Sequence, residues 1–539
     1  MNLFPPFSIT RRRRPEGAAW WGAHQGRHPR GMARAWAKPS AVCVAAALLV
    51  APGAEGFAIE PRSTSEPDVL REPADVTRVV DAWVDGGGMD LHFSLGYQHT
   101  WKRSTIARET QDPDVAARAR SGTVKTPIAK YAENTSRLNI RADLGLYRDL
   151  ALILRVPIVL SSSATLEGRT SSPAALDGAP GSPLFALPFG SPNRSGVEYL
   201  GVGVDWGILN QGRDGQLPSL LVGAEARLSV SEPMHACGPG PAAPGESRGS
   251  TRCTYPADID RDGAGGGYPV TLADGTLTSL EGELPSEPRR AGVSRGTTAI
   301  ELHAAMSRRF SRLEPYVTFG ALFELPVDAS DFMISRPFAD DPPVQGRVSL
   351  GAEFMPWELV EQFQRLSIDV RVTGTYRSEG QDYSELFDAL GSSPSPSYRR
   401  PNFGGYVENP DASSRAAVPS VVDASSERVF PTGLTRVEAH GAYALRLAAR
   451  WQAGQYVHFD VGGALAFTQQ HFITLGRPCD ASRSIEPENA GPCASGAYGS
   501  GVLGAPDPSY RPETDQPGQR FLVDTAHSID TWVGATVMF

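Results

Sequence analysis

The chain contains 539 residues, and its 51 Lys and Arg residues are outnumbered by 60 Asp and Glu residues, giving a formal net charge of −9 at neutral pH. This acidic balance disfavours nucleic acid as a partner. Gly and Pro are abundant, at 56 and 45 residues, and no run of about 18 apolar residues exists that could form a membrane-spanning helix. The composition therefore argues against both ordinary globular domains and a helical membrane protein.

Residues 1–58 have the organisation of an export signal. The apolar run 41–51 follows a basic stretch that contains Arg34 and Lys38, and it precedes small residues that include Gly56 and Ala58. A basic region, a short apolar region and a small-x-small cleavage site are the features of a secretory signal peptide. We expect a leader and signal peptide over 1–58, with Met32 as an alternative start.

Residues 59–87 precede the first strand that the sequence predicts. The stretch is acidic and has apolar residues at partly helical spacing, at Val76, Val79, Val80 and Trp83. It is too short for the folded plug domain of the large transporters, which have about 22 strands. We expect a short N-terminal segment here rather than a separate domain.

From residue 88 onward, apolar and polar residues alternate in segments of eight to twelve residues. Residues 89–97 place apolar side chains at odd positions and Asp90, His92 and Ser94 at even positions. Such segments are long enough to cross a bilayer as tilted strands, with apolar side chains toward lipid. The twelve segments are 89–97, 137–146, 150–160, 199–208, 220–229, 298–307, 316–325, 347–354, 365–376, 437–447, 457–468 and 529–539.

The connections between these segments alternate in length. Short turns follow the second, sixth and tenth segments, whereas the long links cover residues 102–134, 161–198, 230–297, 326–346, 377–436 and 469–528. This alternation predicts an all-β fold, a transmembrane antiparallel up-and-down β-barrel of about 12 strands. The barrel must close, because an open sheet edge in lipid leaves backbone groups without hydrogen bonds.

Two alternatives to this barrel remain at this point. A soluble sandwich or propeller would also alternate, but its apolar faces would pack against a second sheet. Residues 268–280 read as a hairpin with an Asp274-Gly275 turn. We place that hairpin in the third long loop, although it could supply two further strands and raise the count to 14.

The last ten residues end on Phe539, preceded at alternate positions by Val537, Ala535 and Val533. This pattern resembles the closing strand of bacterial outer-membrane β-barrel proteins, whose assembly machinery recognises a terminal aromatic residue. The resemblance is to porin-like and channel-like barrels as a class, over residues 88–539, and to no specific family. It implies a multi-pass barrel in the outer membrane of a Gram-negative cell, with short periplasmic turns and long extracellular loops.

The same resemblance implies the surroundings of the barrel. Its partners would be outer-membrane lipids, lipopolysaccharide and the barrel-assembly machinery, and Phe539 would be the assembly signal. The segment 59–87 would lie in the periplasm and could partly enter the barrel.

Charged residues on the predicted inner faces carry both signs, so the barrel interior must be wet or salt-bridged. Mixed signs do not predict strong ion selectivity. The predicted lumen-lining residues are Asp90, His92, Arg137, Arg141, Asp143, Arg155, Asp205, Glu225, Arg227, Glu301, His303, Glu353, Asp369, Arg371, Glu438, Arg446 and Asp460.

Two interpretations of this lumen stay open. One is a narrow aqueous channel that binds a small polar solute. The other is a lumen closed by Arg–carboxylate networks, in which Asp143 would lie diagonal to Arg155 and within ion-pair reach. Four histidines are predicted to face inward, but they belong to different strands, so we expect lone side chains rather than a metal site; they are His92, His303, His440 and His458.

The cysteines and an Asp-rich stretch belong to the predicted loops. Cys237 and Cys253 form one close pair and Cys479 and Cys493 another, which in an exported protein indicates two local disulfides. The third long loop also contains Asp258, Asp260 and Asp262, followed by Gly263, which resembles the start of a calcium loop. Because Pro269 stands where an EF-hand has Glu, this is a weak candidate for structural calcium, with a solvated turn as the alternative. No other cofactor is expected.

No catalytic motif stands out in the chain, so we expect no enzyme. Twelve-stranded outer-membrane phospholipases carry a His-x-Ser-Asn motif, whereas here His92 and Ser94 are followed by Leu95. The sequence favours a porin-like channel for small polar solutes. The alternatives are a non-conducting surface scaffold or adhesin that uses the long acidic loops, and, with less support, an outer-membrane hydrolase.

Overall fold

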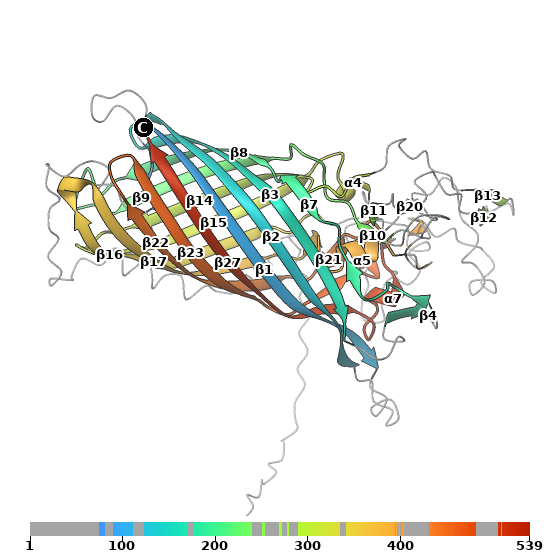
Figure 1. Cartoon of the computed structure of the whole chain (residues 1–539). Helices are drawn as coiled ribbons and strands as arrows, with labels where there is room; N and C mark the ends of the chain where they lie inside the picture. Colours follow the sequence, from blue (N-terminus) through green and yellow to red (C-terminus); the bar gives the residue numbers. More distant parts are fainter. Residues whose placement is uncertain are drawn as a thin grey trace, which may run out of the picture. The chain divides into compact units, whose positions relative to one another are not determined.

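Twelve long antiparallel strands form a closed barrel (Figure 1). The computed structural model describes residues 75–80, 90–111, 123–169, 176–179, 182–239, 251–253, 269–271, 277–279, 289–334, 341–393, 395, 398, 402–403, 428–429, 431–480, 505–507 and 509–539. In order around the barrel, the strands are β1 (Leu91–Gln111), β2 (Thr123–Tyr147), β3 (Leu150–Gly168), β8 (Leu200–Leu209), β9 (Ser219–Leu228), β14 (Thr297–Ser307), β15 (Leu313–Pro326), β16 (Gln345–Leu359), β17 (Gln364–Arg377), β22 (His440–Gln452), β23 (Val457–Thr468) and β27 (Phe521–Met538). Strand β27 pairs back with β1, so the sheet has no free edge.

The prediction of twelve strands is confirmed, since each segment predicted from alternation lies wholly or mostly within one of these strands. The hairpin at 268–280 does not add to the count. Its strands β12 (Pro269–Thr271) and β13 (Leu277–Ser279) pair only with each other, as a separate two-stranded sheet. The barrel therefore has twelve strands rather than fourteen.

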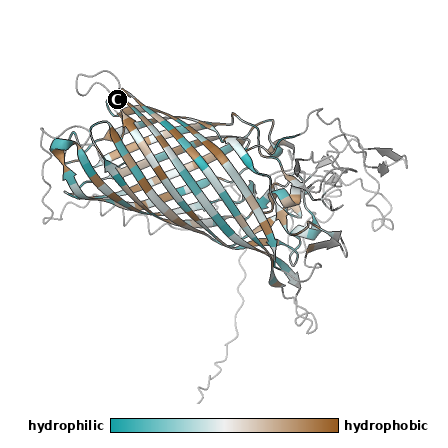
Figure 2. Cartoon of the chain, viewed as in Figure 1, coloured by the Kyte–Doolittle hydropathy of each residue, from teal (hydrophilic) through white to brown (hydrophobic). Residues whose placement is uncertain are grey.

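Alternation places the apolar side chains on the outside of the barrel. Leu95, Val372 and Val533 are 45%, 55% and 54% exposed although they are apolar. Brown and teal residues accordingly alternate along each strand (Figure 2). A soluble sandwich would bury these side chains against a second sheet, so that alternative is wrong. The exterior is suited to lipid, as in outer-membrane barrels.

The helices in the described part of the chain are short, and none of them is long and apolar enough to cross a membrane. They are α4 (Asp331–Ile334), α5 (Phe387–Gly391), α7 (Pro512–Asp515) and the 3-10 helix η2 (Val360–Gln362). The short strands outside the ring are β4 (Asp177–Ala179), β5 (Ser182–Pro183), β6 (Phe189–Gly190), β7 (Arg194–Val197), β10 (Cys237–Pro239), β11 (Thr251–Cys253), β18 (Gly380–Asp382), β19 (Asn402–Phe403), β20 (Arg428–Val429), β21 (Thr435–Val437), β24 (His471–Thr474), β25 (Cys479–Asp480) and β26 (Ala505–Pro506).

The two ends of the barrel differ. At the end with short turns, the chain closes the seam with its last residue: the Phe539 N–H donates to the Leu91 carbonyl at 2.9 Å, and the Leu91 N–H donates to the Phe539 carbonyl at 3.1 Å. At the other end, β1, β2 and β3 continue beyond the predicted segments, and α5, α7 and β10 gather there (Figure 1). By the parity of the connections, the first end is periplasmic and the second is extracellular.

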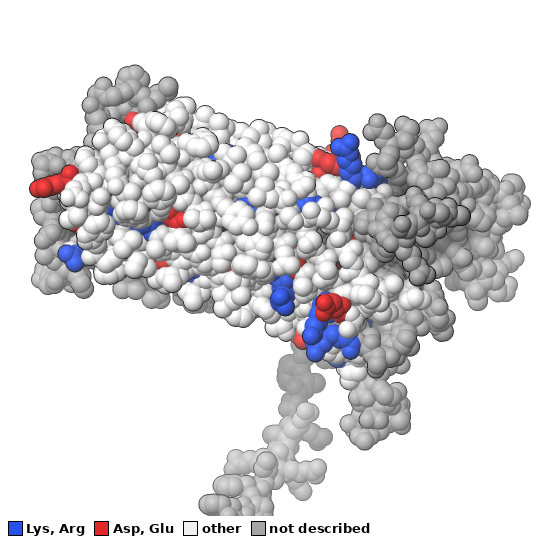
Figure 3. All heavy atoms as spheres, viewed as in Figure 1, with Lys and Arg blue, Asp and Glu red and all other residues white. Residues whose placement is uncertain are grey.

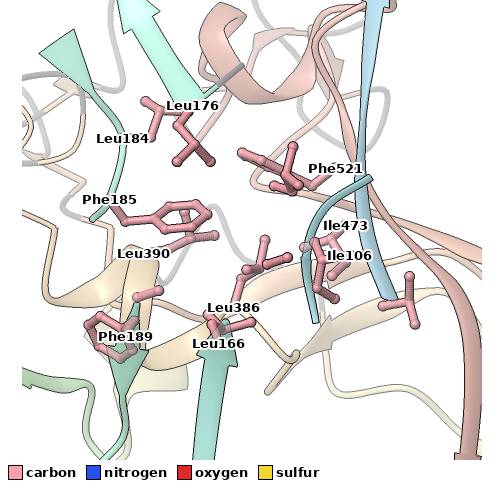
Figure 4. Packing of buried hydrophobic residues seen from close by; sticks show 14 of the residues in the cluster. Ile106, Leu166, Leu176, Leu184, Phe185, Phe189, Leu386, Leu390, Ile473 and Phe521 are labelled. Atoms are coloured by element: carbon pink, nitrogen blue, oxygen red, sulfur yellow. The ribbon is translucent and has the colours of Figure 1, made fainter. Parts of the chain in front are cut away.

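The extracellular end holds a packed apolar core. Ile106 of β1, Leu166 of β3 and Phe521 of β27 contribute the barrel side of this core, and they are at most 2% exposed. Phe185 and Leu390 come from separate loops and point toward the same centre (Figure 4). The remaining members are Ile128, Ala129, Leu176, Leu184, Phe189, Leu386, Ala389, Tyr398, Ile473, Leu475, Val523 and Ala526. The long loops are therefore folded against the strand ends.

Candidate functional site: a charged lumen crossed by a segment at each end

Strand alternation sends most of the predicted lumen residues to the inner face of the barrel. Their immediate neighbours along each strand are the exposed apolar residues of the outer face. The predicted residues on inner faces are His92, Arg137, Arg141, Asp143, Arg155, Asp205, Glu225, Arg227, Glu301, His303, Glu353, Asp369, Arg371, Arg446 and Asp460.

Two predicted lumen residues lie elsewhere. Asp90 comes just before the first residue of β1 and is exposed at the periplasmic rim. Glu438 lies between β21 and β22 and is also exposed, with its carboxylate accepting the Phe472 N–H at 3.2 Å. Both fall outside the ring of strands, where strict alternation no longer decides which way a side chain points.

Ion pairs cover much of the inner wall. Glu225 accepts from Arg155 at 3.3 Å and from Arg227 at 3.1 Å, and Arg227 also contacts Glu301. The pair predicted between Asp143 and Arg155 is not formed. Asp143 pairs instead with Arg141 on its own strand, at 2.7 Å. Cross-strand and same-strand pairs therefore satisfy the charges that the barrel encloses.

Residues 75–80, called here the plug segment, lie inside the periplasmic end of the barrel. The Asp75 carboxylate pairs with Arg450 of β22 at 2.9 Å, and the Thr77 and Ser307 hydroxyls are hydrogen-bonded at 2.7 Å. Ser307 belongs to β14, which β15, β16 and β17 separate from β22. The plug segment therefore crosses the lumen between two walls.

The plug segment is held chiefly by charge. Burial opposes the ionised form of Asp75, but Arg450 and Arg78 hold the pKa of this carboxyl below its ordinary value. Val80 adds a buried apolar contact, since it is 5% exposed. This segment is part of the N-terminal stretch that the sequence places in the periplasm.

A cavity of 190 Å³ lies between the plug segment and the barrel wall. The residues that line it are Asp75, Arg78, Val79, Val80, His92, Ser94, Arg141, Asp143, Ala151, Ile153, Asp205, Arg446, Arg450, His458, Asp460 and Thr536. Charged groups thus surround a space large enough for a small solute, because one water occupies only about 30 Å³ in the liquid.

The extracellular mouth is crossed by residues 380–391, called here the lid segment, which run from β18 to α5. Glu385 of the lid segment pairs with Lys102 of β1 at 2.9 Å. Asp382 accepts from Arg295 at 2.8 Å, and Arg295 also pairs with Glu324 of β15 at 2.7 Å. Strands β1 and β15 lie on opposite walls of the ring, so the lid segment spans the opening.

The carboxylates of the lid segment are buried but compensated. Burial raises the pKa of Asp382, yet Arg295 and Arg377 outweigh it and leave the pKa below the ordinary value. Burial also raises the pKa of Glu385, but Lys102 outweighs burial and leaves this pKa below its ordinary value. Both groups are therefore ionised at neutral pH, and their partners hold the lid segment in place.

The loops carry the predicted disulfide residues. Cys237 and Cys253 are joined, and they lie opposite each other on β10 and β11. Cys479 is also disulfide-bonded, but Cys493 lies outside the described residues. Asp258, Asp260 and Asp262 lie outside them as well, so the calcium hypothesis stays a prediction. Within the described residues, no cluster of His, Cys, Asp and Glu could hold a metal ion.

The inward histidines are engaged separately. The His303 ring bonds the Asp205 carboxylate at 2.8 Å, and the His440 ring stacks on His471 with centroids 4.0 Å apart. His92 and His458 both line the cavity, at its periplasmic end. The four histidines predicted to face inward therefore lie at three separate places in the barrel.

Comparison with known proteins shows likeness in fold only. No protein-family model matches the sequence, and no curated protein matches it. An outer-membrane channel of the COG4313 type from Pseudomonas putida F1 is 8% identical, with 87% of this chain and 99% of that chain covered and a TM-score of 0.33. A FadL homologue of Pseudomonas aeruginosa is 9% identical, over 88% and 93%, with a TM-score of 0.28. The outer membrane protease OmpT from Escherichia coli is 8% identical, over 84% and 96%, with a TM-score of 0.22. Likeness at this level carries no argument about activity or substrate.

Sequence reasoning missed several residues of the site. Trp532 lies on the inner face of β27, between Asp530 and Gly534, and its position in the alternation could have revealed this. Lys102, Asp382 and Glu385 belong to stretches that the sequence assigns to loops, and no local pattern marks them. Only the three-dimensional closure of the barrel brings them together.

Proposed function

We propose that this chain is an outer-membrane channel for small polar solutes, closed in the conformation described here. The observation that carries the proposal is the 190 Å³ cavity inside the barrel, which is lined by both acidic and basic side chains. Charged groups at membrane depth face a protein interior or a water-filled cavity, and they mark pathways of solutes and ions.

Closure at both ends supports a gated channel rather than an open pore. The plug segment is tied by Asp75 to Arg450, and the lid segment is tied by Asp382 and Glu385 to three basic residues. A handful of ion pairs can be displaced by voltage, by pH or by a solute that competes for the same groups. Passage then requires displacement of both segments.

The apolar exterior and the chain terminus support insertion into the outer membrane. Phe539 is 70% exposed at the periplasmic rim, where an assembly factor can reach it. We propose outer-membrane lipids and lipopolysaccharide as the partners of the outer surface, and the barrel-assembly machinery as the partner of the terminal strand.

Planar bilayers test the proposal directly. Purified protein is expected to give stepwise currents at raised voltage, with a low open probability at neutral pH because both segments are closed. Complete absence of currents over a wide range of voltage and pH, for protein shown to be folded, would contradict the proposal.

A second candidate function is a non-conducting surface scaffold. It is favoured by one observation: the extracellular loops share a buried core, with Leu184, Phe185 and Leu386 at most 2% exposed. Such a core is what a rigid platform for a binding partner requires. A silent barrel in bilayers, even after the ion pairs of the lid segment are removed, would favour this candidate over the channel.

A further inference from the structure

Arg446 is the arginine of the cavity for which no salt bridge is found among the described residues, whereas Arg78, Arg141 and Arg450 each have one. Asp75 pairs with Arg450 at 2.9 Å, Asp143 with Arg141 at 2.7 Å, and Asp205 with His303 at 2.8 Å. Asp460, the remaining acid of the cavity, lies opposite Arg450 in the pairing of β22 with β23, and it likewise makes no salt bridge within the described part of the chain. Among the described residues, Arg446 makes no salt bridge, and its buried Nε has no acceptor.

The surroundings of Arg446 add positive charge. Arg371 lies directly opposite it in the pairing of β17 with β22, an arrangement in which like charges repel. Arg371 is itself occupied, since its Nε donates to the Tyr316 hydroxyl at 2.8 Å and its guanidinium contacts Asp369 at 3.4 Å. The open hydrogen-bonding capacity at this point of the wall therefore belongs to Arg446.

Trp532 gives Arg446 a defined position. The Arg446 guanidinium lies 4.2 Å from the centre of the inward Trp532 ring, a contact that holds an arginine plane without consuming its N–H donors. The indole ring has room because Gly462 faces it on β23, where a Cβ atom would overlap the ring. Because the Nε atom is buried, the terminal nitrogens of the guanidinium are the donors left for a planar anion.

The cavity beside Arg446 also has an apolar side. Val79 and Val80 of the plug segment face the space together with Ala151 and Ile153 of β3. A ligand with one planar anionic group for Arg446 and a small apolar body for these four side chains fits this part of the cavity. Small organic carboxylates have this combination.

We propose that Arg446 and Trp532 form a binding point for small organic carboxylates inside the lumen. This inference rests on the proposed channel function and names its solute class. The carboxylate accepts hydrogen bonds from the Arg446 guanidinium, and the apolar body packs between the plug segment and β3. Neutral solutes of the same shape lack the anionic group and bind weakly.

Calorimetric titration of the purified full-length protein with sodium benzoate tests the proposal. Wild-type protein is expected to bind benzoate, and Arg446→Gln is expected to weaken binding at least about tenfold. Arg446→Lys, which keeps the charge but loses the fork, is expected to fall between them. Gly462→Val, which displaces the indole ring, is expected to weaken binding as well.

The matched control is Arg347→Gln. Arg347 also faces inward, on β16, but it is half exposed, is not among the residues that line the cavity, and has its one salt bridge within the described residues to Glu301, at 3.9 Å. This variant is expected to bind benzoate as wild type does. Benzamide, the uncharged relative of benzoate, is expected to give no measurable binding to any variant.

The outcomes separate the binding point from the channel. Equal benzoate affinity in wild type and in folded Arg446→Gln would overturn the proposal, as would equal affinity for benzoate and benzamide. Benzoate binding that depends on Arg446 in a protein without currents supports the binding point and removes the channel. Currents without benzoate binding would support the channel and overturn the binding point.

Discussion

Neutralising Asp382 is expected to open the lid segment. The Asp382 side chain is fully buried, accepts from Arg295 at 2.8 Å and from Arg377 at 3.0 Å, and also accepts the Tyr383 N–H at 2.8 Å. Breaking a buried ion pair costs about 3–5 kcal/mol. Because the two arginines are about 30% exposed, solvent screens part of this, and we expect about 2–3 kcal/mol for Asp382→Asn.

That free energy has a measurable consequence. Since every 1.4 kcal/mol is tenfold, the ratio of open to closed channels is expected to rise about 30- to 140-fold. Single-channel recording in planar bilayers at neutral pH and fixed voltage measures this ratio as open probability. The open probabilities of wild type and of the variant are then compared at the same salt concentration.

Glu379→Gln is the matched control for this experiment. Glu379 lies three residues before Asp382 but is exposed, and its partners Arg436 and Arg477 are 14% and 56% exposed. Exposed pairs contribute about 0–1 kcal/mol, so the open probability is expected to change less than about fivefold. Unchanged gating in Asp382→Asn, or an equal change in Glu379→Gln, would refute the role given to the buried lid pairs.

Three further outcomes follow from the same contacts. Asp75→Asn removes the carboxylate that pairs with Arg450, and single-channel recording is expected to show more frequent opening, since the periplasmic plug segment loses its main ion pair. Lowering the pH is expected to act on Asp382 and Glu385, whose pKa values lie below the ordinary 3.8 and 4.5. Their stabilisation is complete above about pH 4.5 and is lost as the pH falls through the lowered values, so the open probability in bilayer recordings is expected to rise from its low value at neutral pH as the pH falls below that range. Deleting Phe539 is expected to reduce the amount of heat-modifiable barrel in outer-membrane fractions several-fold, and unchanged amounts would argue against its role as the assembly signal.

The ring of strands could be predicted from the sequence because a lipid-facing barrel imposes one rule on every strand. Residues such as Leu95 and Val533 must point outward, and His92 and Asp143 must then point inward. The alternation of short and long connections also predicts that strands consecutive in the chain are neighbours in the barrel. Local alternation and chain connectivity are both visible without any knowledge of long-range contacts.

The two closing segments could not be predicted in the same way. The core at the extracellular end joins Leu166, Phe185, Leu390 and Phe521, which are separated by about 20 to several hundred residues and fall in stretches that the sequence assigns to the long links. The ion pairs of the lid segment likewise join residues that only the closed ring brings together.

The plug segment shows the limit most clearly. The sequence identifies residues 59–87 as a short stretch ahead of the first strand, but a short polar stretch carries no signal for where it binds. Its place depends on Arg450 and Ser307, which are more than 200 residues away in the chain. The sequence does not predict this contact because its partners are far apart in the chain, and not because their chemistry is unusual.

Cysteine labelling of two adjacent residues tests the claim that the barrel encloses an aqueous interior behind a lipid-facing wall. Ser94 lines the cavity, whereas Leu95 is 45% exposed on the outer face of the same strand. In outer-membrane fragments of variants that also carry Asp75→Asn and Asp382→Asn, so that neither segment blocks the lumen, a charged thiol reagent that cannot cross lipid is expected to label Ser94→Cys and to leave Leu95→Cys unlabelled. Labelling of Leu95→Cys with protection of Ser94→Cys would contradict the account.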